Sequence, residues 1–270
     1  MSFLEHLSEL RSRLRNGAIV FLVAVFVSFY FVKKYFVFLT RPARMAWEIS
    51  LAGKPAVFHF ASPTEPFWVY TKIAIIGALL FASPIIFWEL WKFVAPGLYK
   101  KERRMVMAIT GATAGCFLGG AVFGYTVLCT PALSYMFSFA EKFNGFEIQP
   151  TIMMDELVGF MLAMLLGTGV AFELPVVLAV LGWIGLVSSR MLWKFDKYAL
   201  ILSAVVGGVL TPGPDVLSQV LMAGPLFALY NLSILIVWLI ERGRKRAMDD
   251  LEKGDSGDGD GSSKSLVRSP

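Results

Sequence analysis

Six apolar runs separated by short polar segments constrain this chain more than any other feature. They are Gly17–Leu39, Ile73–Val94, Met105–Cys129, Leu157–Trp183, Tyr198–Leu210 and Val220–Ile240. All but the fifth are long enough to cross about 30 Å of hydrocarbon as helices. Charged residues make up 17% of the 270 positions, against about a quarter in a soluble domain. The pattern predicts an all-α integral membrane protein with six transmembrane helices.

The fifth run, Tyr198–Leu210, is shorter than the others. Its thirteen residues rise only about 20 Å as a helix. We therefore expect this span either to borrow flanking residues or to thin the bilayer around it. The following segment, Thr211-Pro-Gly-Pro-Asp215, is rich in helix breakers and predicts a tight turn before the sixth run.

Lysine and arginine are distributed unevenly between alternate connecting segments. One set of segments holds Arg11, Arg13, Arg15, Lys100, Lys101, Arg103, Arg104, Arg190, Lys194, Lys197, Arg242, Arg244, Lys245 and Arg246. The other set holds Arg41, Arg44, Lys54 and Lys142, with Lys72 at the outer end of the second run. Because cytoplasmic loops carry the basic excess, this asymmetry predicts both termini on the cytoplasmic side. The basic residues form no stripe with interleaved aromatics, so the net charge of +5 does not indicate nucleic-acid binding.

Three regions follow from this topology. Residues 1–16 are expected to form an amphipathic helix along the cytoplasmic interface, because apolar side chains share one helical face. Residues 17–240 form the six-span transmembrane domain. Residues 241–270 begin as a basic segment and, from about Asp249, become rich in Gly, Ser and Asp, which predicts disorder. No small-residue cleavage site follows the first run, so we expect no cleavable signal peptide.

Two carboxylates lie at the predicted cytoplasmic face, and each has a simple structural interpretation. Glu9 can pair with Arg13, one helical turn later. Glu102 follows the helix-ending Pro96 and lies among four cations, where a local ion pair is the simpler role. A pair of exposed carboxylates is also suited to binding two guanidinium groups, because each carboxylate accepts one arginine in a bidentate fork.

Glu173 is an ionisable residue near the middle of the fourth run. Such a residue costs a few kcal/mol on insertion scales, so it should face a wet cavity or a polar partner. Pro175 removes a helix hydrogen bond nearby. The alternative is a protonated glutamate that is bonded to a neighbouring helix. The Gly-rich segments Gly111–Gly120 and Gly207–Gly208 predict close helix packing.

No pattern for hydrolytic or redox chemistry is present in the sequence. His6 and His59, the two histidines, fall on opposite sides of the membrane in this topology and cannot share a metal. Cys116 and Cys129 lie about 20 Å apart along one predicted helix, too far for a disulfide. HExxH, GxSxG and Walker motifs are absent. We expect neither enzymatic activity nor a cofactor nor a metal.

Five motifs, in order along the chain, resemble the TatC family, the polytopic subunit of the twin-arginine protein translocase. They are His6-Leu-Ser-Glu9-Leu-Arg11-Ser-Arg13-Leu, Ser62-Pro-Thr-Glu65-Pro, Phe93-x-x-Pro96-x-Leu98-Tyr99-x-x-Glu102-Arg103-Arg104, Phe172-Glu173-x-Pro175 and Pro214-Asp215-Val-x-Ser218-Gln219. The resemblance implies a concave, glove-like bundle in the bacterial cytoplasmic (inner) membrane. It also implies recognition of Arg-Arg signal peptides on folded precursors, which are exported with the proton-motive force. The implied partners are single-span TatA/TatB-type subunits and further TatC copies.

The resemblance also implies roles for individual residues. Glu9 and Glu102 match the two carboxylates that recognise the signal peptide, and the surrounding surface matches Phe93, Pro96, Leu98, Tyr99 and Arg103. Glu173, with Pro175, matches an intramembrane polar site that contacts partners. Pro214, Asp215 and Gln219 match the outer turn and the start of the sixth span, although the turn here is a residue longer than the family pattern.

A different class of function stays open from the residues alone, namely an ion-coupled secondary transporter with Glu173 as its proton carrier. Such a transporter predicts a second intramembrane ionisable group, for which Glu89 is the candidate, and broken helices in paired halves. An intramembrane enzyme would need a nucleophile–base or metal set on facing runs, and the runs contain none.

Overall fold

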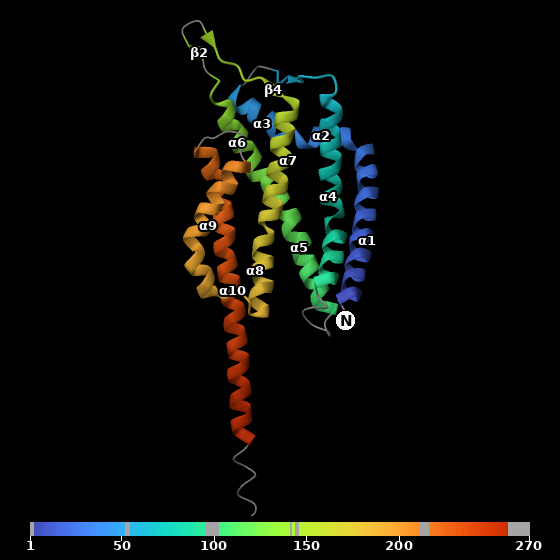
Figure 1. Cartoon of the computed structure of the whole chain (residues 1–270). Helices are drawn as coiled ribbons and strands as arrows, with labels where there is room; N and C mark the ends of the chain where they lie inside the picture. Colours follow the sequence, from blue (N-terminus) through green and yellow to red (C-terminus); the bar gives the residue numbers. More distant parts are fainter. Residues whose placement is uncertain are drawn as a thin grey trace, which may run out of the picture.

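The structure, a computed structural model, is a bundle of long helices with short strands at one end (Figure 1). It describes residues 3–51, 55–94, 103–140, 142–143, 146–210 and 216–258. The elements are α1 (Phe3–Tyr30), α2 (Val32–Leu39), α3 (Arg41–Ser50), β1 (Phe58–His59), α4 (Glu65–Val94), α5 (Arg103–Phe123), the π-helix η2 (Gly124–Leu128), α6 (Cys129–Phe137), β2 (Lys142–Phe143), β3 (Phe146–Glu147), β4 (Ile152–Met153), α7 (Met154–Ala171), α8 (Glu173–Ile184), α9 (Ser189–Leu210) and α10 (Val216–Asp258).

The two ends of the bundle differ. The strands, with β1 parallel to β4 and β2 antiparallel to β3, lie at what we call the strand end. The N-terminus of α1 and the C-terminal part of α10 lie at the opposite end, which we call the terminal end (Figure 1). The start of α1 and the end of α10 therefore share one end of the bundle, and the cytoplasmic location of this end stays a prediction.

Five helical stretches in the described residues are long and apolar enough to cross a membrane. They are Leu7–Tyr30, Glu65–Phe93, Val106–Phe137, Met154–Ile184 and Gln219–Arg246. The mainly helical membrane architecture is thus confirmed. Helix α9 is not among the five, because its first half carries charged residues such as Arg190 and Lys194. Its 22 residues nevertheless rise about 33 Å. The helix begins at Ser189 and so is longer than the predicted apolar run, which begins at Tyr198. The count of six spans stays a prediction.

The first predicted span, Gly17–Leu39, is divided in the structure. Helix α1 ends at Tyr30, and Phe31 (φ −97°, ψ 6°) separates it from α2. Both α2 and α3 lie at the strand end (Figure 1). The predicted boundary at Leu39 is therefore wrong. An apolar run does not distinguish a spanning helix from an interfacial one, and the aromatic residues with Lys33 and Lys34 near the break are typical of the interface.

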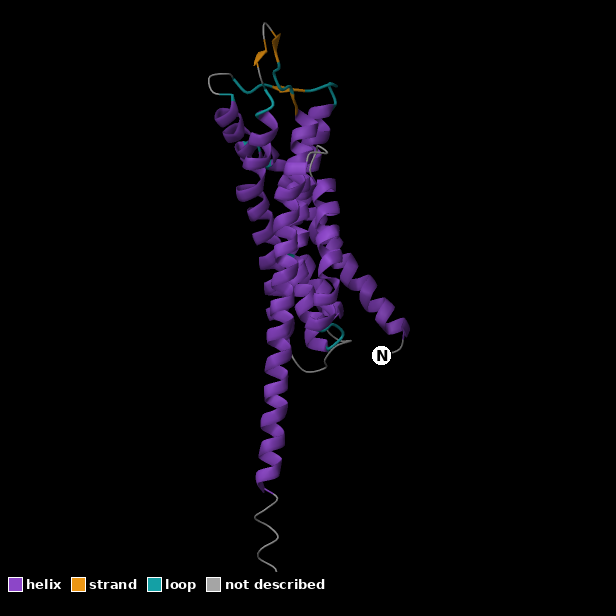
Figure 2. Ribbon diagram, turned by 90° about the vertical axis from the view of Figure 1, so that its left-hand side faces the viewer, coloured by secondary structure: helices purple, strands orange, loops and turns teal. Residues whose placement is uncertain are grey.

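Two expected boundaries are not breaks in the structure. Helix α1 continues through residue 16, although its N-terminal part leans out of the bundle (Figure 2). Helix α10 continues to Asp258, whereas disorder was expected from about Asp249. Opposite charges four residues apart, such as Lys245 with Asp249 and Arg246 with Asp250, favour a helix there. That α1 begins along the membrane interface stays a prediction.

Glycines bring some of the helices close together. A Cβ on Gly120 of α5 would lie 2.5 Å from the Thr168 carbonyl oxygen of α7, and one on Gly207 of α9 would lie 2.9 Å from the Gln219 carbonyl oxygen of α10. The predicted close packing is confirmed at these positions and at Gly208, which faces the Gln219 side chain. It is wrong for three other glycines, beside which a Cβ would meet open space: Gly111, Gly115 and Gly119.

Candidate functional site

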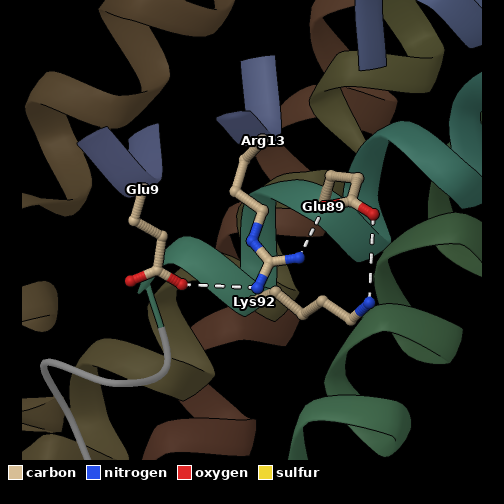
Figure 3. A network of polar contacts seen from close by, with 4 residues as sticks. All are labelled: Glu9, Arg13, Glu89 and Lys92. Carbon is tan, nitrogen blue, oxygen red and sulfur yellow. Dashed lines mark hydrogen bonds and ion pairs between the residues drawn. The ribbon is translucent and has the colours of Figure 1, made fainter. Parts of the chain in front are cut away.

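A cluster of four charged side chains lies at the terminal end, where α1 packs along α4. Figure 3 shows Glu9 and Arg13 on α1 facing Glu89 and Lys92 on α4. Arg13 Nη2 donates to Glu9 Oε1 at 3.3 Å, and its Nη1 donates to Glu89 Oε2 at 3.2 Å. Lys92 Nζ lies 3.8 Å from Glu89 Oε1. We call these four residues the terminal cluster.

The terminal cluster pairs two carboxylates with two cations, so its charges balance. Arg13 makes one hydrogen bond to each carboxylate and therefore bridges the two helices. The side chain of Glu89 is 15% exposed and that of Glu9 is 23% exposed, so both remain in contact with water. Ion pairs of this kind contribute about 0–1 kcal/mol each to stability. The cluster therefore leaves its side chains free to exchange partners at small cost to the fold.

An apolar groove of about 340 Å³ adjoins the terminal cluster between α1 and α4. Its apolar walls include Leu10, Leu14 and Phe93, and Arg13 and Glu89 also line it. We call it the α1–α4 groove. Charged groups thus lie beside an apolar surface that suits a ligand with both a basic part and an apolar part.

The structure places some of the predicted recognition residues together at this end. Glu9 pairs with Arg13, so the ion pair expected from their spacing is confirmed. Phe93, near the end of α4, lines the groove with Arg13 and Glu89. The remaining predicted positions, Pro96, Leu98, Tyr99 and Glu102, lie outside the described residues, and of Arg103 the structure describes only its place at the start of α5.

The segment that carries Glu102 is nevertheless bracketed by described helices. Helix α4 ends at Val94 and α5 begins at Arg103, and both of these helix ends lie at the terminal end (Figure 1). Eight residues, which include Glu102, connect these two helix ends and lie outside the described residues.

Glu173 lies where the fourth predicted span bends. Helix α7 ends at Ala171, Phe172 separates the helices, and Glu173 begins α8. Pro175 is the third residue of α8, where its missing N–H would have no intrahelical partner in any case. Pro175 therefore lies in the first turn of α8, directly after the break at Phe172.

Both carboxylate oxygens of Glu173 are buried, and neither makes a well-formed hydrogen bond in the part of the chain that the structure describes, although the Phe117 backbone of α5 lies close enough to interact with the carboxylate. A cavity of about 630 Å³ lies close by between α5, α8 and α10, and its lining is almost wholly apolar. Phe172 and Pro175 line it, but Glu173 does not. A buried, unsatisfied acceptor costs about 1–3 kcal/mol, so an external polar group that reached Glu173 would gain free energy by bonding to it.

Gln219 has a structural position near the start of α10. Its Nε2 donates to the Ala204 carbonyl of α9 at 2.9 Å, and its side chain faces Gly208. It therefore joins α9 to α10. Pro214 and Asp215, predicted beside it in the outer turn, lie outside the described residues.

Sequence reasoning missed two further contacts. It did not join Arg13 to Glu89, which are 76 residues apart in the chain. It also gave no role to Glu65, whose carboxylate accepts from the backbone N–H of Ala61 (2.7 Å) and of Asp155 (3.1 Å) and so ties the segment before α4 to the start of α7. The signal available for Glu65 was its place in a motif with Pro on either side of it. Within the described residues, no group of three or more His, Cys, Asp or Glu side chains could hold a metal ion.

The chain is similar to known translocase proteins over most of its length. The family model described as "Sec-independent protein translocase protein (TatC)" matches residues 5–225. The TatC protein of Koribacter versatilis is 34% identical over 95% of this chain and 92% of its own length. That of Aquifex aeolicus is 34% identical over 91% of this chain and 98% of its own length.

A solved structure shares the fold as well. The crystal structure titled as the twin arginine translocase receptor TatC superposes with a TM-score of 0.74 at 33% identity, and the match covers 87% of this chain and 99% of the other. The family expected from the five motifs is thereby confirmed. The protein belongs to the TatC family of Sec-independent protein translocase proteins.

Proposed function

We propose that the protein is the receptor subunit of a twin-arginine translocase. It recognises Arg-Arg signal peptides of folded precursor proteins and, with single-span TatA/TatB-type subunits and further copies of itself, exports the precursors with the proton-motive force. The observation that carries the proposal is the position of Glu9 at the terminal end, where it pairs with Arg13, a residue that lines the α1–α4 groove together with Phe93.

The proposed membrane topology has six spans, with α9 as the fifth and both termini in the cytoplasm of a bacterial cell. The N-terminal half of α9, which carries Arg190, Lys194 and Lys197, lies toward the terminal end together with the arginine-containing N-terminal part of α1 and the basic start of α5 (Figure 1). Basic residues collect on the cytoplasmic side of membrane proteins, which supports the terminal end as the cytoplasmic one.

Recognition at this end follows from the geometry of guanidinium and carboxylate groups. Glu9 and Glu102 each accept one arginine of the signal peptide through both oxygens. The apolar part of the peptide then enters the bilayer along the helices. A lysine ammonium cannot form the two-point contact, so a Lys-Lys signal binds less well than Arg-Arg.

Glu173 has a separate proposed role within the membrane. Its buried carboxylate makes no well-formed hydrogen bond among the described residues, which supports a contact with a polar or basic group from a partner subunit or from the bound signal peptide. No catalytic chemistry is proposed for any residue of the chain.

Site-specific crosslinking from positions 9, 102 and 173 to a twin-arginine precursor tests this proposal. We expect crosslinks from positions 9 and 102 before translocation and from position 173 once partner subunits are engaged. Glu102→Ala should abolish export while the protein still inserts into the membrane. Normal export by that variant, with crosslinks to the loop unchanged, would contradict the recognition role. Solute or proton flux in liposomes without partner subunits would instead favour an ion-coupled transporter.

A further inference from the structure

We propose that in the unliganded protein Arg13 pairs with Glu9 and so takes the position of a signal-peptide arginine. When the peptide binds, Arg13 leaves Glu9 and pairs with Glu89 alone. The proposal rests on the function proposed above. It makes Arg13 an internal competitor and Glu89 its acceptor, so the terminal cluster exchanges one ion pair for another when a peptide arrives.

The contact between Arg13 and Glu9 is weak enough to be displaced. Arg13 reaches one oxygen of Glu9, Oε1, through a single nitrogen at 3.3 Å. Charge-assisted N–H···O bonds are commonly about 2.7–2.9 Å, and the strong arrangement is a fork to both oxygens. A peptide guanidinium that takes both oxygens of Glu9 therefore gains more than Arg13 loses on leaving.

Glu89 can hold Arg13 without a new contact having to form first. Arg13 Nη1 already donates to Glu89 Oε2 at 3.2 Å, so the guanidinium stays paired after it leaves Glu9. Glu89 is the less exposed of the two carboxylates, at 15% against 23%, and water and salt screen it less. The guanidinium of Arg13 therefore stays paired throughout the exchange, which avoids the cost of leaving it without a counter-charge.

Arg13 also gains a bond by moving. Its Nε is buried and has no hydrogen-bond partner among the described residues. A fork to Glu89 through Nε and one terminal nitrogen would satisfy that donor, whose burial without a partner costs free energy. Lys92 can yield its place on Glu89, because its Nζ lies 3.8 Å away and is also held 4.7 Å from the centre of the Trp88 ring.

The consequence is a receptor that releases its ligand readily. When the peptide leaves, Arg13 returns to Glu9, so the competitor shortens the lifetime of the complex. Because differences in affinity between related complexes appear mainly in dissociation rates, Arg13 should act on the dissociation rate more than on the association rate.

Binding of a fluorescent twin-arginine signal peptide to the full-length protein in lipid nanodiscs tests the exchange. Arg13→Gln should lower the dissociation constant by about 1.5- to 5-fold, the range that an exposed ion pair supplies, and mainly through slower dissociation. Glu89→Gln should raise the dissociation constant by a similar factor, because Arg13 then has only Glu9. The double variant should match Arg13→Gln alone, since Glu89 matters only while Arg13 is present.

Further variants separate this mechanism from a merely structural role. Arg13→Lys, which cannot bridge both carboxylates as a fork, should fall between the wild type and Arg13→Gln. Lys72→Gln removes a comparable exposed ion pair, with Asp155 at 2.6 Å, at the strand end, and should leave binding unchanged. A Lys-Lys peptide, which needs only one oxygen of Glu9, should gain less from Arg13→Gln than the Arg-Arg peptide does.

Two results would overturn the exchange. If Arg13→Gln weakened peptide binding as much as Glu9→Gln does, Arg13 would build the site rather than compete for it. If the effects of Arg13→Gln and Glu89→Gln simply added in the double variant, Glu89 would not receive Arg13. Failure of the underlying function looks different: Glu9→Gln would then leave binding unchanged, and the wild type would bind Arg-Arg and Lys-Lys peptides equally.

Discussion

Glu9 and Glu173 are both proposed contact sites, but their surroundings in the bundle are opposite. Glu9 lies at the terminal end, is partly exposed to water and already has a guanidinium partner within the chain. Glu173 lies at the bend between α7 and α8, and its buried oxygens make no well-formed hydrogen bond among the described residues. A carboxylate of the first kind can be exchanged between ligands at small cost. A carboxylate of the second kind lowers the unfolding free energy of the isolated subunit, and a hydrogen bond from a partner would restore it.

The largest effect should come from removing the recognition carboxylate. Glu9→Gln should weaken twin-arginine peptide binding by about 10- to 100-fold, because hydrogen bonds to charged groups contribute about 1.5–3 kcal/mol. The thermal unfolding midpoint of the purified variant should change little, since Glu9 contributes only a partly exposed ion pair to the stability of the fold. Peptide titration and thermal unfolding of the same preparation measure both quantities. A large loss of stability would show that Glu9 is structural.

At Glu173, by contrast, we expect a substitution to change the stability of the purified subunit. Glu173→Leu should raise the unfolding free energy of the purified subunit by about 1–3 kcal/mol, because it removes a buried, unsatisfied acceptor. Export should fall at the same time, since the proposed contact with a partner is lost. Denaturant unfolding in detergent and an export assay in cells measure the two effects. Leu174→Ala, at the exposed neighbouring residue, serves as the control. A destabilised Glu173→Leu protein would mean that Glu173 has a partner within the chain after all.

The smallest expected effect concerns salt. Raising NaCl from about 0.05 M to about 0.5 M should weaken peptide binding at the terminal cluster several-fold, because the Debye length shortens from more than 10 Å to less than 5 Å. Crosslinking yield from position 173, normalised to the amount of bound precursor, should stay the same because the buried site is screened much less. If both sites responded equally, the contrast between an exposed and a buried carboxylate would be lost.

The sequence predicted the class of fold, the family and the ion pair of Glu9 with Arg13, because each depends on local spacing or on apolar runs. It could not predict the link from Arg13 to Glu89, since that contact depends on the register of α1 against α4. It misplaced the end of the first span at Leu39, because an apolar run continues through Phe31 although the helix does not. The sequence also predicted close packing at Gly111 from the Gly-rich segment around it, whereas the structure has open space beside this residue. Packing partners are a property of the whole bundle.

Helix α10 continues beyond the rest of the bundle at the terminal end (Figure 2). Residues 241–258, which follow the sixth apolar run, rise about 27 Å as a helix. A continuous helix of this length transmits rotation as well as position, which a flexible tail does not. A spin label or fluorophore near Asp258 would therefore report how the sixth apolar run turns in the membrane, from a site outside it.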